Sequence, residues 1–170
     1  MLNSLYNKTK SWGPGSCMVA FYFFSLIPLV VLFTTGLFND KIKPSQIVLT
    51  NIDIFSHSLL VAPWFETILI QVLLTKVFTM MKCKSVNIIL AVSLLFSVFH
   101  LSNGWIYPFV LFIPGLVFSW NYYLYYDKDE WVWGMLSTSV LHFLYNFTLF
   151  VFIPMINIVL TIYYDTDILN

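Results

Sequence analysis

Residues 62–71 read Ala-Pro-Trp-Phe-Glu-Thr-Ile-Leu-Ile-Gln, an apolar run that carries a single carboxylate at Glu66. Glu66 is the only acidic residue inside any apolar segment of the chain. A charged side chain in a lipid bilayer is costly, so an intramembrane glutamate indicates a functional site and requires polar partners. The choice of partners is narrow, because the whole chain has only three histidines.

The composition around this run is that of an integral membrane protein. Of the 170 residues, 59% are hydrophobic and only 9% are charged, and the mean hydropathy is +0.83, whereas soluble domains are roughly 45–50% apolar. We expect one all-α membrane domain, residues 1–170, with room for about five or six spans of roughly 20 residues. The net charge is zero without any basic run, so lipid is an expected partner and nucleic acid is not.

Apolar runs and prolines outline the expected spans, which cover residues 17–38, 63–81, 86–101, 105–125 and 131–150, with a short sixth segment ending near residue 164. The first run is longer than the roughly 7–15-residue core of a signal peptide, which favours a retained span. Residues 46–61 are mixed in polarity and predict an interfacial segment. Pro63 suits a first helical turn. Pro108 and Pro114 predict kinks in the fourth span, and Pro154 predicts a bend before the sixth.

The distribution of lysines predicts the orientation of these spans. If the N-terminus is cytoplasmic, most of the lysines lie on or near the cytoplasmic side, namely Lys8, Lys10, Lys76, Lys82, Lys84 and Lys128. Cytoplasmic loops of membrane proteins carry an excess of Lys and Arg, which favours this orientation. It places Glu66, His100, His142 and Asn146 in the outer half of the membrane.

The third and fifth expected spans each carry a polar stripe at helical spacing, formed by Ser93, Ser97 and His100 and by Ser139, His142 and Asn146. Lipid offers no hydrogen-bond partners, so both stripes are expected to face the interior of the bundle. Taken singly, Glu66 could be a protonated packing group, and His142 and Asn146 a structural hydrogen-bonded pair. Together, one carboxylate, two imidazoles and one amide at the same depth in the membrane favour a functional site.

These residues resemble the motifs of a known family. Glu66, then Phe-x-x-x-His at 96–100, then His-x-x-x-Asn at 142–146, is similar to the pattern of the CPBP intramembrane proteases. That family comprises CAAX prenyl endopeptidases and bacterial bacteriocin-processing or immunity relatives. The resemblance covers about residues 61–147 and implies a four-helix catalytic core, a multi-pass protein of the bacterial plasma membrane, and a peptide or protein substrate.

The first motif departs from the family pattern. The family usually shows Glu-Glu-x-x-x-Arg, whereas here Thr67 follows Glu66 and Gln71 occupies the place of the arginine. One negative and one positive charge are thus replaced together by neutral hydrogen-bonding side chains. Because the two opposite charges are lost together, we interpret the first motif as a variant that keeps the geometry of the site rather than as a decayed one. Thr67, Gln71 and Phe96 are expected to support the site.

Amide hydrolysis assigns roles to the four polar residues. It requires a base for the attacking water, a proton for the leaving amine and hydrogen-bond donors for the oxyanion. Glu66 is the expected base, His100 positions the water, and His142 and Asn146 are expected donors. In an alternative scheme Glu66, His100 and His142 bind zinc. The sequence has no H-E-x-x-H helix and no evident second carboxylate to serve as base, which favours the scheme without a metal or other cofactor.

Three classes of function remain open at this point. The favoured one is an intramembrane endopeptidase acting on a membrane-associated substrate of the CAAX or bacteriocin type. The second is a non-catalytic or weakly catalytic partner, such as a bacteriocin immunity protein, in which the altered first motif allows binding without turnover. The third is an ion or proton carrier, or a haem protein with two histidine ligands.

Overall fold

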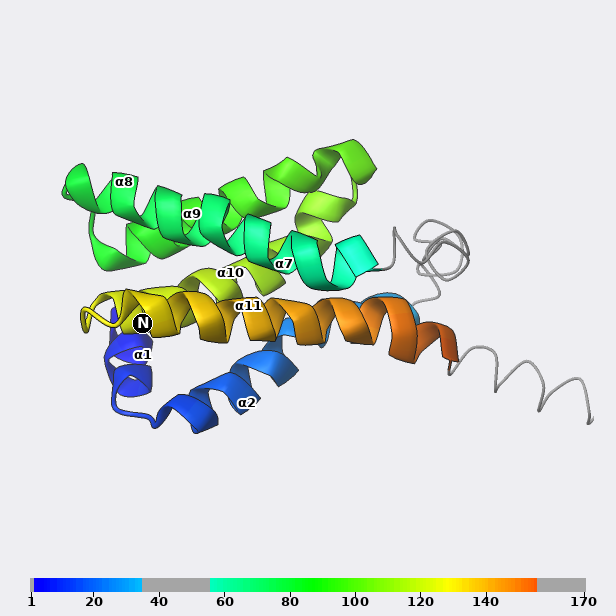
Figure 1. Ribbon diagram of the computed structural model, residues 1–170, viewed down its shortest axis with the longest axis horizontal. Helices are drawn as coiled ribbons and strands as arrows, with labels where there is room; N and C mark the ends of the chain where they lie inside the picture. The colour runs from blue at the N-terminus through cyan, green and yellow to red at the C-terminus, as the bar shows by residue number, and fades with distance from the viewer. Residues whose placement is uncertain (1, 35–55, 156–170) are drawn as a thin grey trace, which may run out of the picture.

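The computed structural model describes residues 2–34 and 56–155, and these residues form helices and turns only (Figure 1). The predicted sixth segment and most of the predicted interfacial segment lie outside the described residues. The elements in chain order are α1 (Leu2–Lys10), α2 (Pro14–Ser25), α3 (Ile27–Thr34), η1 (His57–Val61), α7 (Ala62–Glu66), η2 (Thr67–Leu74), α8 (Thr75–Met80), α9 (Ser85–Phe99), η3 (His100–Asn103), α10 (Tyr107–Tyr126), α11 (Trp131–Phe147) and η4 (Thr148–Phe152). The predicted all-α class is confirmed.

Three of the helices are long and apolar enough to cross a membrane. Within the described ranges they are His57–Met80, Ser85–Asn103 and Trp131–Met155, with 24, 19 and 25 residues. A helix rises 1.5 Å per residue, so each of the three is long enough to cross a hydrocarbon core of about 30 Å. The central helix α10 is also 20 residues long, but its tyrosines, tryptophan and asparagine make it less hydrophobic. It packs against α9, α11 and α2, so protein rather than lipid surrounds most of its surface.

The helix that carries Glu66 begins earlier than expected. It runs without interruption from His57, six residues before the predicted start at Pro63, so the end of the predicted interfacial segment is helical. Its geometry alternates, because the stretches η1 and η2 on either side of α7 are π-helical. Such wider turns are rare and recur at functional sites.

Two prolines, Pro28 and Pro108, act differently from the sequence prediction. The predicted first span is divided at Leu26 into α2 and α3, because Pro28 has no N–H to donate to the preceding turn. Pro108 lies in the first turn of α10 and therefore interrupts no hydrogen bond there. The helix that begins at Trp131 includes Pro154 and reaches Met155. The bend predicted before the sixth segment falls where the described residues end, so it stays a prediction.

Polar side chains of these helices face inward and apolar side chains face outward. On the Glu66 helix, Thr67 and Gln71 have no exposed surface, whereas Phe65 and Leu69 are more than half exposed. A bilayer accepts apolar groups but offers no hydrogen bonds, so this distribution is the one expected of a protein surrounded by lipid. The chain is therefore an integral membrane protein.

Close packing and interior hydrogen bonds join the helices. Asn121 of α10 is fully buried, and its Nδ2 donates to Ser137 Oγ and Thr138 Oγ1 of α11, each at 2.9 Å. Gly115 allows α9 and α10 to approach, since a Cβ atom at this position would lie 2.8 Å from Cδ1 of Phe96. Hydrogen bonds and small residues are the main sources of helix association in lipid.

The N-terminal helix and the α10–α11 turn meet at one end of the bundle. Tyr6 Oη donates to Asp127 Oδ2 at 3.2 Å, and Lys10 forms an ion pair with the same carboxylate. Figure 1 shows α1, the end of α8 and the α10–α11 turn at this end, which we term the lysine end. It holds the segments that contain the six lysines predicted to be cytoplasmic. The grouping matches the expectation, while the orientation in the membrane stays a prediction.

Candidate active site

Three separate helical segments bring the four predicted polar residues together. Glu66 is the last residue of α7, His100 follows the end of α9, and His142 and Asn146 lie one turn apart on α11. Because α9, α10 and α11 pack side by side, the inward faces of α9 and α11 meet the helix that carries Glu66. Residues separated by 34 and 76 positions from Glu66 thus become its neighbours.

Glu66 lies between the two histidines. Its Oε2 atom is 3.5 Å from His100 Nε2 and 3.6 Å from His142 Nε2. The side chains differ in exposure, at 29% for Glu66, 19% for His100 and 4% for His142. Both distances exceed the roughly 2.7–2.9 Å of a direct charge-assisted hydrogen bond, so each nitrogen is close to the carboxylate without being bonded to it.

The hydrogen bond of His100 to the backbone identifies its proton. His100 Nδ1 lies 2.8 Å from the carbonyl oxygen of Phe96, and a carbonyl oxygen can only accept. Nδ1 therefore carries hydrogen, and in the neutral ring Nε2 is an acceptor. An acceptor nitrogen and a carboxylate oxygen face each other at 3.5 Å. This arrangement suits a bridging donor between them, such as a water molecule.

Aromatic rings fix the two imidazoles. Phe96 lies with its ring centroid 4.9 Å from that of His100 and 5.6 Å from that of His142. Phe118 of α10 stacks on His142 at 4.7 Å with an interplanar angle of 27°. Phe96 and Phe118 have almost no exposed surface, so the imidazole of His142 is held on two sides by rings that exclude water.

Asn146 connects the site to the start of the Glu66 helix. Its Nδ2 atom donates to the backbone carbonyl of Ser58 at 3.0 Å, across 88 residues of chain. Ser58 lies in the π-helical stretch η1, where backbone carbonyls are paired differently from those of an α-helix. One of the two amide hydrogens of Asn146 is thus occupied, and only the other remains for a ligand.

A cavity of about 210 Å³ connects these groups. Its walls come from η1, α7, α9, η3, α10, α11 and η4, and they are formed by Ser58, Ala62, Glu66, Phe96, His100, Asn103, Tyr107, Leu111, His142, Tyr145, Asn146, Leu149 and Phe150. All four predicted site residues and Phe96 are among them. The cavity combines a polar centre with apolar and aromatic walls, as small-molecule and peptide sites commonly do.

Thr67 and Gln71 lie next to the site rather than in its wall. Both are fully buried, and neither the Thr67 hydroxyl nor the Gln71 amide has a hydrogen-bond partner among the described residues. The serines of the α9 stripe bond within their own helix, with Ser93 Oγ donating to Ile89 O and Ser97 Oγ to Leu94 O. They face the interior as predicted but contribute nothing to the cluster around Glu66.

The donor set can be tested against zinc. Among the described residues, no group of three His, Cys, Asp or Glu side chains is already arranged as a metal site. Two ligands of one tetrahedral zinc with bonds of 2.0–2.1 Å are about 3.3 Å apart. The distances from Glu66 Oε2 to the two imidazoles, 3.5 and 3.6 Å, are close to that value. Glu66, His100 and His142 therefore offer donor atoms of the right kind for zinc, but among the described residues they do not form a group placed to hold a metal ion.

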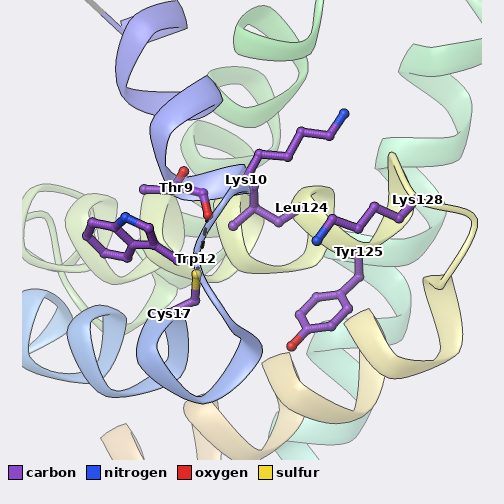
Figure 2. Close-up of a pocket in the computed structure, with 7 residues that line it drawn as sticks. All are labelled: Thr9, Lys10, Trp12, Cys17, Leu124, Tyr125 and Lys128. Atoms are coloured by element: carbon purple, nitrogen blue, oxygen red, sulfur yellow. Dashed lines mark hydrogen bonds between the residues drawn. The ribbon is translucent and has the colours of Figure 1, made fainter.

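A second pocket lies at the lysine end and does not resemble an active site. Figure 2 shows its lining residues from α1, α2 and the end of α10, together with Trp12 and Lys128. Its volume is only about 10 Å³. The hydrogen bond drawn there runs from Cys17 Sγ to the Thr9 carbonyl oxygen at 3.5 Å. With no histidine and no carboxylate in its lining, this pocket offers no base for hydrolysis.

Sequence reasoning missed three residues of the site. Phe118 and Tyr145 belong to apolar or aromatic stretches in which interior and lipid-facing rings look alike. The contribution of Ser58 is a backbone carbonyl, which no side-chain pattern reveals. Tyr145 follows His142 by three positions on the same helical face, and this spacing was the one available signal.

Comparisons with known proteins bear on the same region. The family model described as "Type II CAAX prenyl endopeptidase Rce1-like" matches residues 49–148, which include every predicted site residue. No curated protein matches the chain. No solved structure matches it either.

Proposed function

Because the chain belongs to the Rce1-like family of type II CAAX prenyl endopeptidases, we propose that it is an intramembrane endopeptidase. Its substrate is a membrane-associated peptide or protein of the CAAX or bacteriocin type. The observation that carries this proposal is the position of Glu66 Oε2, 3.5 and 3.6 Å from two imidazole nitrogens, in the wall of a cavity of about 210 Å³.

Water activation is the first step of the proposed mechanism. A water between Glu66 Oε2 and His100 Nε2 donates one hydrogen to each acceptor, since both groups present lone pairs toward the space between them. Glu66 takes a proton as the water oxygen attacks the carbonyl carbon of the substrate. The hydrogen bond from His100 Nδ1 to Phe96 O holds the ring in the tautomer that accepts from water.

Charge on the substrate oxygen is stabilised in the second step. The attack forms a C–O bond and leaves a negative charge on the former carbonyl oxygen. His142 and the free amide hydrogen of Asn146 are the donors proposed for this oxygen. The C–N bond then breaks, the leaving amine receives the proton held by Glu66, and a carboxylic acid and an amine are released.

Zinc is an alternative partner for the same residues. If present, it would be held by Glu66, His100 and His142, and it would supply Lewis-acid polarisation and a more acidic bound water. We favour the scheme without metal, because among the described residues no second carboxylate lies in the cavity wall to act as base if Glu66 binds an ion. In either scheme the aromatic walls exclude bulk water and fix the rings of the histidines.

A binding protein without turnover is the second candidate. The observation that favours it is the buried pair Thr67 and Gln71, which replaces a charged pair in the first family motif and has no hydrogen-bond partner among the described residues. A bacteriocin immunity protein would use the cavity to hold a peptide segment. Both candidates predict peptide binding, and only the first predicts cleavage.

Two of the three histidines, His57 and His142, provide a matched test of the proposed function. The purified protein in detergent or lipid is incubated with farnesylated and unfarnesylated Cys-a-a-X peptides and with apolar leader peptides, and the products are identified by mass spectrometry. Wild type and His57→Ala should cleave at least one peptide, because His57 is exposed and outside the cavity. His142→Ala should lose about 10²-fold or more of the rate.

The outcomes separate the two candidates. Cleavage by His142→Ala at the wild-type rate would refute the proposed mechanism. Peptide binding by the wild type without any cleavage product would establish the binding candidate in its place.

A further inference from the structure

Tyr145 is a buried donor in the cavity wall that the mechanism above does not use. Its side chain is 2% exposed, and its hydroxyl oxygen is buried without a hydrogen-bond partner among the described residues. It lines the same cavity as Glu66, His142 and Asn146. A buried hydroxyl without a hydrogen-bond partner is destabilising, so such a group in a cavity wall requires an explanation.

The ring of Tyr145 is fixed by the same aromatic wall as His142. Tyr145 packs edge-on against Phe118, with ring centroids 6.0 Å apart and an interplanar angle of 80°. Phe118 also stacks on the imidazole of His142. Phe118 therefore contacts both the phenol of Tyr145 and the imidazole of His142.

The donors proposed above for the oxyanion are His142 and Asn146, and Asn146 is partly occupied. One amide hydrogen of Asn146 is used by the carbonyl oxygen of Ser58, so only one amide hydrogen of Asn146 is left for a substrate oxygen. A tetrahedral oxyanion is stabilised best by two or more preorganised donors. The buried hydroxyl of Tyr145 has no hydrogen-bond partner among the described residues. It would therefore add a donor in place of the Asn146 amide hydrogen that the Ser58 carbonyl oxygen already accepts.

We propose that Tyr145 is a further catalytic residue, whose hydroxyl donates a hydrogen bond to the substrate carbonyl oxygen and to the oxyanion that forms from it. This inference rests on the proposed endopeptidase function. No bond to Tyr145 forms or breaks, and its proton stays on the phenol throughout. The hydroxyl acts together with His142 and the remaining amide hydrogen of Asn146 on the same oxygen.

Tyr145→Phe tests this role, because it removes one oxygen and keeps the ring. The rate of cleavage of the best peptide substrate is measured with wild type and variant, as kcat and KM separately. We expect kcat to fall about 10²-fold, the usual effect of losing one oxyanion donor, with KM changed by less than about threefold. Tyr123→Phe is the matched control, since its hydroxyl donates to Ser85 Oγ outside the cavity, and its kcat should stay at the wild-type value.

Thermal unfolding of the same variants separates a catalytic role from a structural one. Loss of an unpaired buried hydroxyl leaves stability unchanged or raises it, whereas loss of a bonded one lowers it. We therefore expect the Tm of Tyr145→Phe to equal or exceed that of the wild type. A lowered Tm with unchanged kcat would show a structural hydroxyl and overturn the inference.

The failures of the two proposals are distinguishable. If the wild type cleaves a peptide and Tyr145→Phe cleaves it with the same kcat, the role of Tyr145 is refuted and the proposed function stands. If the wild type binds peptides but cleaves none, the proposed function is refuted and the inference with it.

Discussion

At the scale of single residues, the environment of Glu66 explains how a carboxylate is retained in a membrane helix. Its side chain faces a cavity and two imidazoles rather than lipid. The spacing of the sequence predicts this neighbourhood, because helical periodicity decides which residues share a face. His100, His142 and Asn146 were identified in that way, since polar residues are conspicuous in an apolar chain.

The same reasoning could not find Phe118 or Tyr145. Aromatic residues make up 19% of the chain, and a ring that faces lipid differs little in sequence context from one that faces the interior. Only the packing of α10 against α9 and α11 distinguishes them. The roles of Phe118 and Tyr145 are therefore tertiary properties.

Asn146 gives a prediction at this scale. Asn146→Ala removes the hydrogen bond to Ser58 O, so we expect a lower Tm and a free energy of unfolding reduced by about 1 kcal/mol. Because the second amide hydrogen is also lost, kcat should fall about 10-fold or more. Thermal unfolding and peptide cleavage are measured on the same preparation. Asn87→Ala is the control, because Asn87 is exposed on α9; an effect on Tm as large as that of Asn146→Ala would contradict the account.

At the scale of elements, the long apolar helices are predictable and their irregularities are not. The spans that contain His100 and His142 begin within one residue of the predicted positions. The π-helical stretches that flank α7 were not predicted, because composition does not distinguish π from α turns. The kink predicted at Pro108 was wrong for a related reason: the effect of a proline depends on its position in the helix, and Pro108 lies in the first turn of α10.

The contact between α9 and α10 depends on one glycine. Gly115→Ala would place a Cβ atom 2.8 Å from Phe96 Cδ1 and 3.1 Å from the Ser93 carbonyl oxygen. Neither the ring nor the backbone can move freely, so we expect a loss of roughly 1–3 kcal/mol in the free energy of unfolding. Activity should also fall, because Phe96 contacts both imidazoles.

Gly15→Ala is the matched control for this substitution. A Cβ atom at Gly15 meets nothing within 4 Å, and alanine favours a helix, so the variant should be as stable as the wild type or more stable. The two free energies of unfolding are compared by thermal or denaturant unfolding in the same detergent. Equal stability of Gly115→Ala and Gly15→Ala would contradict the proposed close contact.

At the scale of the whole molecule, composition alone predicts an all-α integral membrane protein, and the structure agrees. The reason is that 59% hydrophobic residues cannot be buried in 170 residues of soluble protein without leaving large apolar surfaces. In the structure those surfaces lie outside, as on Phe65, Leu69 and Leu94. The arrangement of the helices around α10 was not predictable from hydropathy, because hydropathy indicates how apolar a helix is but not which helices it contacts.

The orientation of the molecule can be measured with a native cysteine. Cys83 is partly exposed in the turn between α8 and α9, at the lysine end, whereas Cys17 is 4% exposed. If the lysine end is cytoplasmic, a membrane-impermeant maleimide should label Cys83 only in permeabilised cells, in a Cys17→Ser background. Ser102→Cys, in η3 at the other end of α9 and combined with Cys17→Ser and Cys83→Ser, should react in intact cells. The reverse pattern would show the opposite orientation.

The central claim is that Glu66 activates the water that hydrolyses a peptide bond. The most direct test compares wild type, Glu66→Gln and Glu130→Gln in the rate of product formation from one peptide substrate. Glu66 and Glu130 are the only two glutamates of the chain, and Glu130 is exposed in the α10–α11 turn. The account predicts equal rates for wild type and Glu130→Gln, and a rate at least about 10²-fold lower for Glu66→Gln with an unchanged Tm. Cleavage by Glu66→Gln at the wild-type rate would contradict it.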